Sequence, residues 1–141
     1  MTMKIAVGTD GSEQANRAVE WCATHAAALD AEVIAVHAID LALFSTSLSV
    51  TPVLLPPKDH VELRARMTDD WCAPLTKAAV PFRVVLMEGA PAPSIIQAAK
   101  TEQADLVVVG RRGRGGFAEL VLGGTSYVLT HHIDRPLLIV P

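Results

Sequence analysis

Residues 105–126 read Asp-Leu-Val-Val-Val-Gly-Arg-Arg-Gly-Arg-Gly-Gly-Phe-Ala-Glu-Leu-Val-Leu-Gly-Gly-Thr-Ser. The continuous apolar, β-branched run at residues 106–109 predicts a strand that is buried on both faces. Glycines and arginines follow, and apolar residues resume with helical spacing from Phe117 to Leu122. We therefore expect a buried strand, a Gly-Arg loop and the beginning of a helix.

This order of parts is typical of a phosphate site. Glycines let the backbone approach an anion closely, and backbone N–H groups with the positive end of a helix dipole hold its charge. Arginines add bidentate donors. The loop holds Gly110, Gly113, Gly115 and Gly116 together with Arg111, Arg112 and Arg114. The alternative is a Gly-rich turn between strand and helix whose arginines are only solvated.

Two other phosphate-binding motifs can be weighed against the loop. Residues 113–118 fit the G-x-G-x-x-A dinucleotide fingerprint, which is a weak signal by itself. That fingerprint requires an acidic residue about twenty positions on, at the end of the next strand. The nearest candidate, Asp134, stands before that strand. A P-loop is excluded because no Gly-Lys-Ser/Thr occurs in the chain.

Size and composition narrow the class of protein. The 141 residues predict one domain, residues 1–141. A net charge of −3 argues against general nucleic-acid or membrane affinity, and no apolar run is long enough to cross a bilayer. Cys22 and Cys72 lack metal-type or redox-type spacing, so we expect buried free thiols in a reducing compartment. No signal peptide opens the chain, and the cytoplasm is the expected location.

The periodicity along the chain predicts five strands that alternate with four helices. The expected strands are residues 4–8, 32–38, 81–87, 106–109 and 137–140. The expected helices are residues 13–29 with Ser12 as N-cap, 58–78 divided or kinked at Pro74, 92–102, and from the Gly-Arg loop to residue 132. Residues 39–57 read as a long loop. This pattern predicts a doubly wound α/β fold with a parallel sheet.

The position of a ligand follows from the topology. If the strand order is 3-2-1-4-5, the chain reverses direction between the first and fourth strands, and a ligand should bind at their carboxyl ends. Those ends are Gly8-Thr9-Asp10-Gly11 and Val109-Gly110. The Gly-Arg motif and the topology therefore point to the same place.

No catalytic motif accompanies this site. The chain has no Gly-x-Ser-x-Gly elbow and no metal-binding histidine pair. His131 and His132 are adjacent, so on a helix they point to different faces and do not easily form one chelate. His25, His37 and His60 are isolated in sequence.

The whole chain resembles the universal stress protein family. Its signature spacing appears as Gly110, two residues, Gly113, nine residues, and Gly123. Further similarity lies at residues 5–12, 36–39, 88–92, 105–110 and 135–140, so that only residues 41–57 carry no family pattern. The signature continues with Ser or Thr, whereas this chain has Gly124 and then Thr125.

The resemblance implies a fold, a ligand and an assembly. It implies a Rossmann-like sheet of order 3-2-1-4-5, as in the adenine nucleotide alpha hydrolase-like group, and a homodimer through residues 137–140. It also implies ATP, possibly with Mg²⁺. By this resemblance Asp10 approaches the ribose and the triphosphate or its metal, the Ala38 backbone recognises adenine, and Gly110, Gly113 and Gly123 wrap the ribose and phosphates. The full candidate set is Thr9, Asp10, Ala38, Val109, Gly110, Arg112, Gly113, Gly123, Gly124 and Thr125.

Three functional hypotheses follow. The first is a regulatory stress-response module that changes shape or partners with ATP occupancy. The second is a weak ATPase on the same fold, and the third is a nucleotide-free dimerisation module. The spacing of the loop favours ATP binding, while Gly124 in place of a hydroxyl residue favours the nucleotide-free module.

Overall fold

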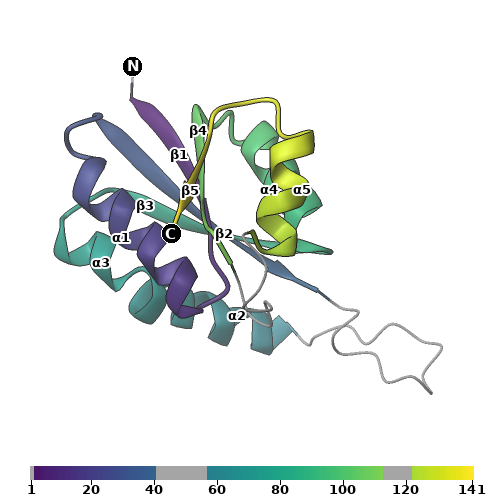
Figure 1. Cartoon of the computed structure of the whole chain (residues 1–141). Coiled ribbons are helices and arrows are strands. Elements are labelled where there is room, and N and C mark those ends of the chain that lie inside the picture. The colour runs from purple at the N-terminus through teal and green to yellow at the C-terminus, as the bar shows by residue number, and fades with distance from the viewer. Residues whose placement is uncertain (1, 41–56, 113–121) are drawn as a thin grey trace.

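Five parallel strands form one sheet in the order β3-β2-β1-β4-β5 (Figure 1). The computed structural model describes residues 2–40, 57–112 and 122–141. The strands are β1 (Met3–Gly8), β2 (Ala31–Ile39), β3 (Phe82–Glu88), β4 (Leu106–Gly110) and β5 (Leu137–Val140). The helical elements are α1 (Glu13–His25), α2 (Pro57–Arg66), the π-helical turn η2 (Met67–Trp71), α3 (Ala73–Lys77), α4 (Pro91–Thr101) and α5 (Gly124–His132). The expected doubly wound α/β fold and strand order are confirmed.

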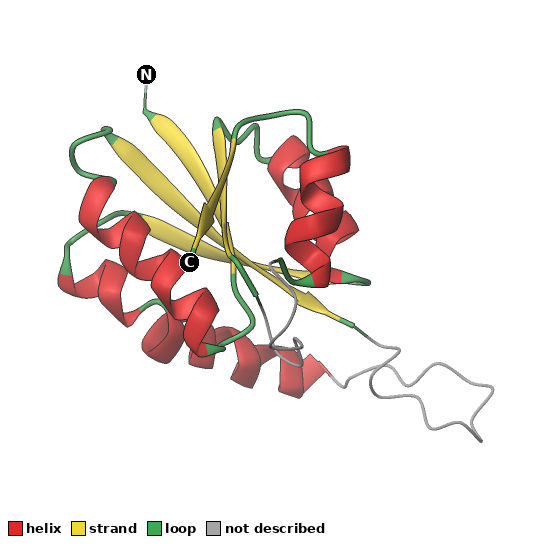
Figure 2. Cartoon of the chain, in the orientation of Figure 1, coloured by secondary structure: helices red, strands yellow, loops and turns green. Residues whose placement is uncertain are grey.

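Helices cover both faces of the sheet (Figure 2). Successive residues of a strand point to opposite faces, so Ile5 and Val7 of β1 pack on one side while Ala6 packs on the other. The first side is filled by α1, η2 and α3, and the second by α4 and α5. Both clusters contain fully buried aliphatic side chains from β4, as expected for the apolar run at residues 106–109.

The expected second helix is in fact divided into three parts. The α-helical pattern ends at Arg66, η2 inserts a π turn, and α3 resumes after Cys72 rather than breaking at Pro74. Pro74 instead lies in the first turn of α3. In the first turn a backbone N–H has no acceptor within the helix, so proline costs no hydrogen bond there. Its fixed φ also suits the start of a helix.

Two other helix limits differ from the expectation. α1 ends at His25, and residues 26–30 form turns that lead into β2. Leu122 and Gly123 are not helical, because Gly123 adopts an extended conformation (ψ 165°) and serves as the N-cap of α5. Residues 113–121, where the final helix was expected to begin, lie outside the described residues, as do residues 41–56 of the expected long loop.

Among the described helices, none combines the length and apolar character needed to span a membrane.

Candidate functional site

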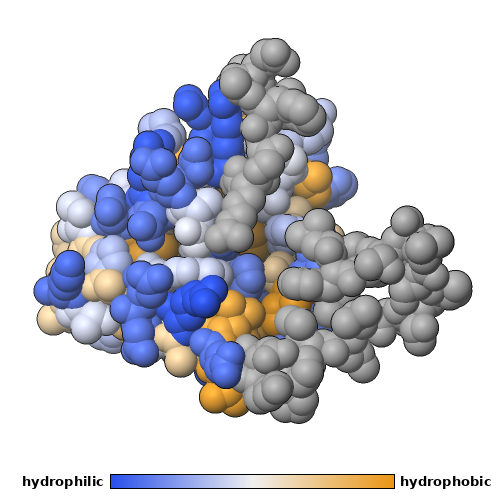
Figure 3. All heavy atoms as spheres, turned by 90° about the horizontal axis from the view of Figure 1, so that it is seen from below, coloured by the Kyte–Doolittle hydropathy of each residue, from blue (hydrophilic) through white to orange (hydrophobic). Residues whose placement is uncertain are grey.

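A pocket opens at the carboxyl ends of β1, β2 and β4. The space inside it is about 550 Å³ when the open solvent at its mouth is included. Figure 3 views the molecule from this end, where polar and apolar side chains lie next to one another. The pocket is lined by Gly8, Thr9, Asp10, Ala15, Val36, His37, Ala38, Pro91, Ile95, Val109, Gly110, Arg112, Gly123, Thr125 and Ser126.

Most of the candidate set meets in this pocket. Thr9, Asp10, Ala38, Val109, Gly110, Arg112, Gly123 and Thr125 all line it. Gly124 is absent from the described lining, although both of its neighbours are present. Gly113 lies outside the described residues. The carboxyl ends of β1 and β4 are adjacent, as the strand order 3-2-1-4-5 requires.

The acidic residue of the site sits in a hydrogen-bonded turn between β1 and α1. Asp10 Oδ1 accepts the Ser12 N–H at 2.9 Å, and Thr9 Oγ1 accepts the Gly11 N–H at 3.3 Å. Ser12 is the N-cap of α1, and its Oγ accepts the Ala15 N–H at 3.1 Å, as its residue type predicts. These bonds hold the Asp10 side chain at the pocket.

The second wall joins the end of β4 to the start of α5. Gly110 packs so closely on α1 that an added Cβ would lie 2.6 Å from the Gln14 carbonyl oxygen. The buried Ser126 hydroxyl donates to the Gly110 carbonyl at 2.7 Å. The Gly123 N–H donates to the Arg111 carbonyl at 2.7 Å. Both ends of the Gly-Arg loop are therefore tied together at the pocket.

The N-termini of α1, α4 and α5 are not equally suited to binding an anion. In α1, the Ser12 side chain accepts a hydrogen bond from one N–H of the first turn, and Glu13 places a negative charge there. In α4, Pro91 and Pro93 remove two N–H groups. The first turn of α5 has no acidic residue, and its N-cap Gly123 makes no side-chain hydrogen bond. Because free N–H groups and the helix dipole attract anions, the start of α5 is better suited to an anion than that of α1 or α4.

Arg112 also lines the pocket. Its Nε is buried, and no group among the described residues accepts a hydrogen bond from it. A buried donor of a charged group costs free energy when it has no acceptor. Arg111, the preceding residue, is exposed and does not line the pocket. The pocket therefore presents a guanidinium whose Nε has no acceptor among the described residues.

Apolar side chains make up much of the remaining lining. They come from Val36 and Ala38 of β2 and from Pro91 and Ile95 of α4. His37 of β2 also lines the pocket, and its Nδ1 lies 2.9 Å from the Thr9 carbonyl oxygen. The pocket thus combines apolar side chains of β2 and α4 with Arg112 and the first turn of α5.

The candidate set left out seven lining residues: Gly8, Ala15, Val36, His37, Pro91, Ile95 and Ser126. Of these, Gly8 belongs to the strand end where a ligand was expected, and Ser126 follows a candidate residue in the sequence. Pro91 and Ile95 carry no such signal, since only the packing of α4 against β2 brings them to the pocket.

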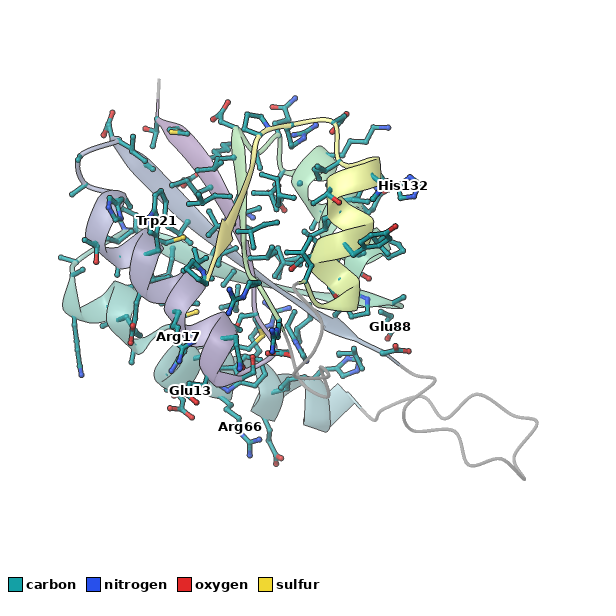
Figure 4. The ribbon with its side chains drawn as sticks, in the orientation of Figure 1. Glu13, Arg17, Trp21, Arg66, Glu88 and His132 are labelled. Carbon is teal, nitrogen blue, oxygen red and sulfur yellow. The ribbon has the colours of Figure 1, made fainter. Side chains whose placement is uncertain are left out.

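The two adjacent histidines lie away from the pocket. His131 and His132 are exposed on α5, with ring centroids 6.5 Å apart. Figure 4 shows His132 at the end of α5, pointing away from the sheet. His131 Nδ1 lies 3.0 Å from the Tyr127 carbonyl oxygen.

Comparisons with known proteins agree with this fold. The model of the universal stress protein family matches residues 1–141. A universal stress protein from Thermus aquaticus is 31% identical over 144 residues and covers 99% of both chains. The solved structure of protein MJ0577 has a TM-score of 0.78 at 23% identity and covers 99% of this chain and 96% of its own. A universal stress protein solved in complex with cAMP has a TM-score of 0.69 at 26% identity and covers 99% and 96%. The chain therefore belongs to the universal stress protein family.

Proposed function

We propose that this chain, as a single domain of residues 1–141, binds an adenine nucleotide, ATP with Mg²⁺, and acts as a nucleotide-dependent regulatory module in a stress response. The observation that carries the proposal is the mixed lining of the pocket. Arg112 and the start of α5 line it together with apolar side chains of β2 and α4. Binding of cAMP by a family member 26% identical to this chain supports an adenine nucleotide.

The mixed lining also gives the ligand a direction. The flat, apolar base fits between β2 and α4, where the Ala38 backbone reads its edge. The phosphates extend toward Gly110, Gly123 and the first turn of α5. Asp10, which also lines the pocket, then lies close to the ribose and to a Mg²⁺ ion carried by the phosphates.

A homodimer through β5 is the second part of the proposal. The side chains of β5 are apolar and each remains partly exposed. At the other edge of the sheet, the Arg64 guanidinium donates to the Val84 carbonyl of β3 at 2.9 Å. Apolar strand edges favour pairing with another chain, and charged side chains disfavour it. The two edges therefore differ, and β5 is the edge suited to a second copy.

The cysteines support a reducing compartment, the cytoplasm. Cys22 and Cys72 are free and buried. Burial raises the pKa of the Cys22 thiol to about 12 and that of Cys72 to about 11. Since the thiolate is the reactive form, neither side chain is suited to redox chemistry at neutral pH.

The two neighbouring arginines test the site directly. A charge-assisted hydrogen bond contributes about 1.5–3 kcal/mol, and about 1.4 kcal/mol is tenfold in affinity. We expect Arg112→Ala to weaken ATP binding about 10–100-fold in titration calorimetry. Arg111→Ala removes the same charge from an exposed position and should change the affinity less than about threefold, as expected for a screened surface charge.

Other outcomes of this experiment are equally clear. Equal losses in the two variants would mean that only the net charge of the loop matters, not the pocket. If the wild-type chain bound no adenine nucleotide, the nucleotide-free dimerisation module would be the better description. Release of phosphate by the bound wild type would favour the weak ATPase.

Substitutions at Thr125 and Gly124 test which residue contacts phosphate in place of the Ser or Thr that the family signature has after its last glycine. Thr125 lines the pocket, whereas Gly124 does not, and a Cβ on Gly124 would meet no atom within 4 Å. We expect Thr125→Ala to weaken ATP binding about tenfold or more, by loss of one hydrogen bond to phosphate. Gly124→Ser should fold normally and add little. Titration calorimetry of both variants checks this. A tighter Gly124→Ser variant with an unaffected Thr125→Ala variant would contradict it.

A further inference from the structure

Two aromatic side chains from distant parts of the chain meet beneath the turn that carries Asp10. They are His37 of β2 and Trp71 of η2. Their ring centroids lie 5.0 Å apart, and their planes cross at 82°. This edge-to-face geometry is a favourable arrangement for aromatic pairs. His37 lines the pocket, while Trp71 lies behind it among the described residues.

Trp71 packs directly against Gly11 in the turn. A Cβ added to Gly11 would lie 2.5 Å from Cε2 and 2.7 Å from Nε1 of the indole. Gly11 also has φ +77°, a conformation that glycine adopts without the strain of other residues. The indole edge therefore occupies the space that a side chain would need, and it sets how far the turn approaches η2.

His37 holds the other end of the turn. Its Nδ1 lies 2.9 Å from the Thr9 carbonyl oxygen. Because a carbonyl oxygen only accepts, Nδ1 carries the proton and donates it. The Thr9 N–H in turn donates to the Val36 carbonyl at 2.9 Å. Thr9 is thus bonded to two successive residues of β2.

The π turn explains how Trp71 comes to this position. The Cys72 N–H donates to the Met67 carbonyl at 2.8 Å, which is the i to i+5 bond of a π-helix. In an α-helix, residues five apart point about 140° away from each other. The wider turn lets both Met67 and Cys72 stay fully buried, and Trp71, the last residue of η2, reaches Gly11.

We propose that Trp71 and His37 are positioning residues for the nucleotide site. They touch the Thr9–Ser12 turn rather than hold the ligand by charge, and they fix the place of the Asp10 carboxylate through that turn. Asp10 follows the turn because its Oδ1 accepts the Ser12 N–H. The nucleotide in this statement rests on the proposed function, whereas the support of the turn does not.

The chain offers a matched control in its second tryptophan. Trp21 of α1 is also partly buried and packs against the same core cluster, but it stacks on His25 and is absent from the described pocket lining. Figure 4 shows it on α1. The variants Trp71→Ala and Trp21→Ala therefore both remove an indole that packs against the same core cluster. Only Trp71→Ala also removes a contact with the turn.

The experiment measures the turn and the affinity separately. Amide hydrogen exchange of Gly11 and Ser12 is followed by NMR without nucleotide, and ATP binding by titration calorimetry. We expect Trp71→Ala to speed exchange of these amides at least tenfold and to weaken ATP binding at least tenfold. Trp21→Ala should do neither, once any difference in thermal stability between the variants is taken into account. If Trp71→Ala does not fold, Trp71→Phe should show smaller changes in the same direction.

His37 is tested by a pair of substitutions of similar size. His37→Leu removes the donor to Thr9, while His37→Asn keeps an N–H group near the position of Nδ1. A neutral hydrogen bond contributes enough for about a 3–10-fold change in affinity. We expect that loss for His37→Leu, and an affinity within about twofold of wild type for His37→Asn.

The outcomes separate the two proposals. Equal exchange and equal affinity in the Trp71 and Trp21 variants would overturn the role of Trp71, and an Asn variant no better than Leu would overturn that of His37. If the wild type bound no ATP but only the Trp71 variants loosened the turn, the proposed function would fail. The support of the turn would stand in that case.

Discussion

Replacing Gly110 with valine should abolish nucleotide binding and destabilise the fold. The Cβ of any side chain at this position would lie 2.6 Å from the Gln14 carbonyl oxygen and 2.9 Å from its carbonyl carbon. These are backbone atoms in the first turn of α1, so they cannot move without shifting the helix. Overpacking of this kind costs about 1–3 kcal/mol, and more when the neighbour is rigid. We expect a loss of about 3 kcal/mol, or roughly 10 °C in Tm for a domain of this size.

Binding should be lost because the added side chain would push β4 away from α1 at the pocket. Gly110 lines it, and the Ser126 hydroxyl bonds to its carbonyl. Circular dichroism on heating measures the stability, and titration calorimetry at a temperature where the variant is folded measures the affinity. Gly110→Ala should show the same defects in weaker form.

Gly124→Ala is the matched control for this substitution. A Cβ there meets nothing within 4 Å, and alanine is a better helix former than glycine by up to about 1 kcal/mol. The control should therefore equal or exceed the wild type in Tm. A Gly110→Val variant with wild-type stability would show that β4 and α1 are not in contact at this point.

Replacing Ile139 with proline should convert the proposed dimer to a monomer. In β5, the Pro136 and Val140 carbonyls accept N–H groups of β4 and its continuation. Because backbone groups of a parallel strand alternate between its two neighbours, the N–H and C=O groups of Ile139 point to the free edge. Proline removes that N–H and leaves the β4 side intact, as tolerated on edge strands.

The expected effect is large because two-fold symmetry applies the substitution twice. Each lost bond that leaves a carbonyl without a partner costs about 1–3 kcal/mol. We therefore expect the Kd of the proposed dimer to rise about 30-fold or more, measured by light scattering across a dilution series.

Ile139→Ala provides the control for side-chain packing. Ile139 packs against the core on the side of α4 and α5, and alanine loses that contact while keeping the N–H group. The alanine variant should be less stable but remain dimeric at micromolar concentration. A wild-type monomer under these conditions, or a proline variant that stays dimeric, would rule out pairing through β5.

The sequence by itself determined the layout of this protein. Strand positions and the N-cap at Ser12 follow from local signals, namely continuous apolar runs and a hydroxyl before a helix. The candidate residues rest in part on the family resemblance, and eight of the ten line one pocket. The strands and the cap depend on residues close together in the chain, so periodicity and spacing are sufficient to predict them.

Only the tertiary structure decided how the site is supported. The π turn that splits the expected second helix, and the contact of Trp71 with Gly11 and His37, depend on segments far apart in sequence. Thr125 rather than Gly124 lines the pocket because of the rotation of α5 about its axis. The hydrogen bond from the Ser126 hydroxyl to the Gly110 carbonyl helps to fix that rotation. Periodicity gives the face of a helix but not its contacts across the sheet, because packing selects those contacts from many arrangements of similar hydrophobic energy.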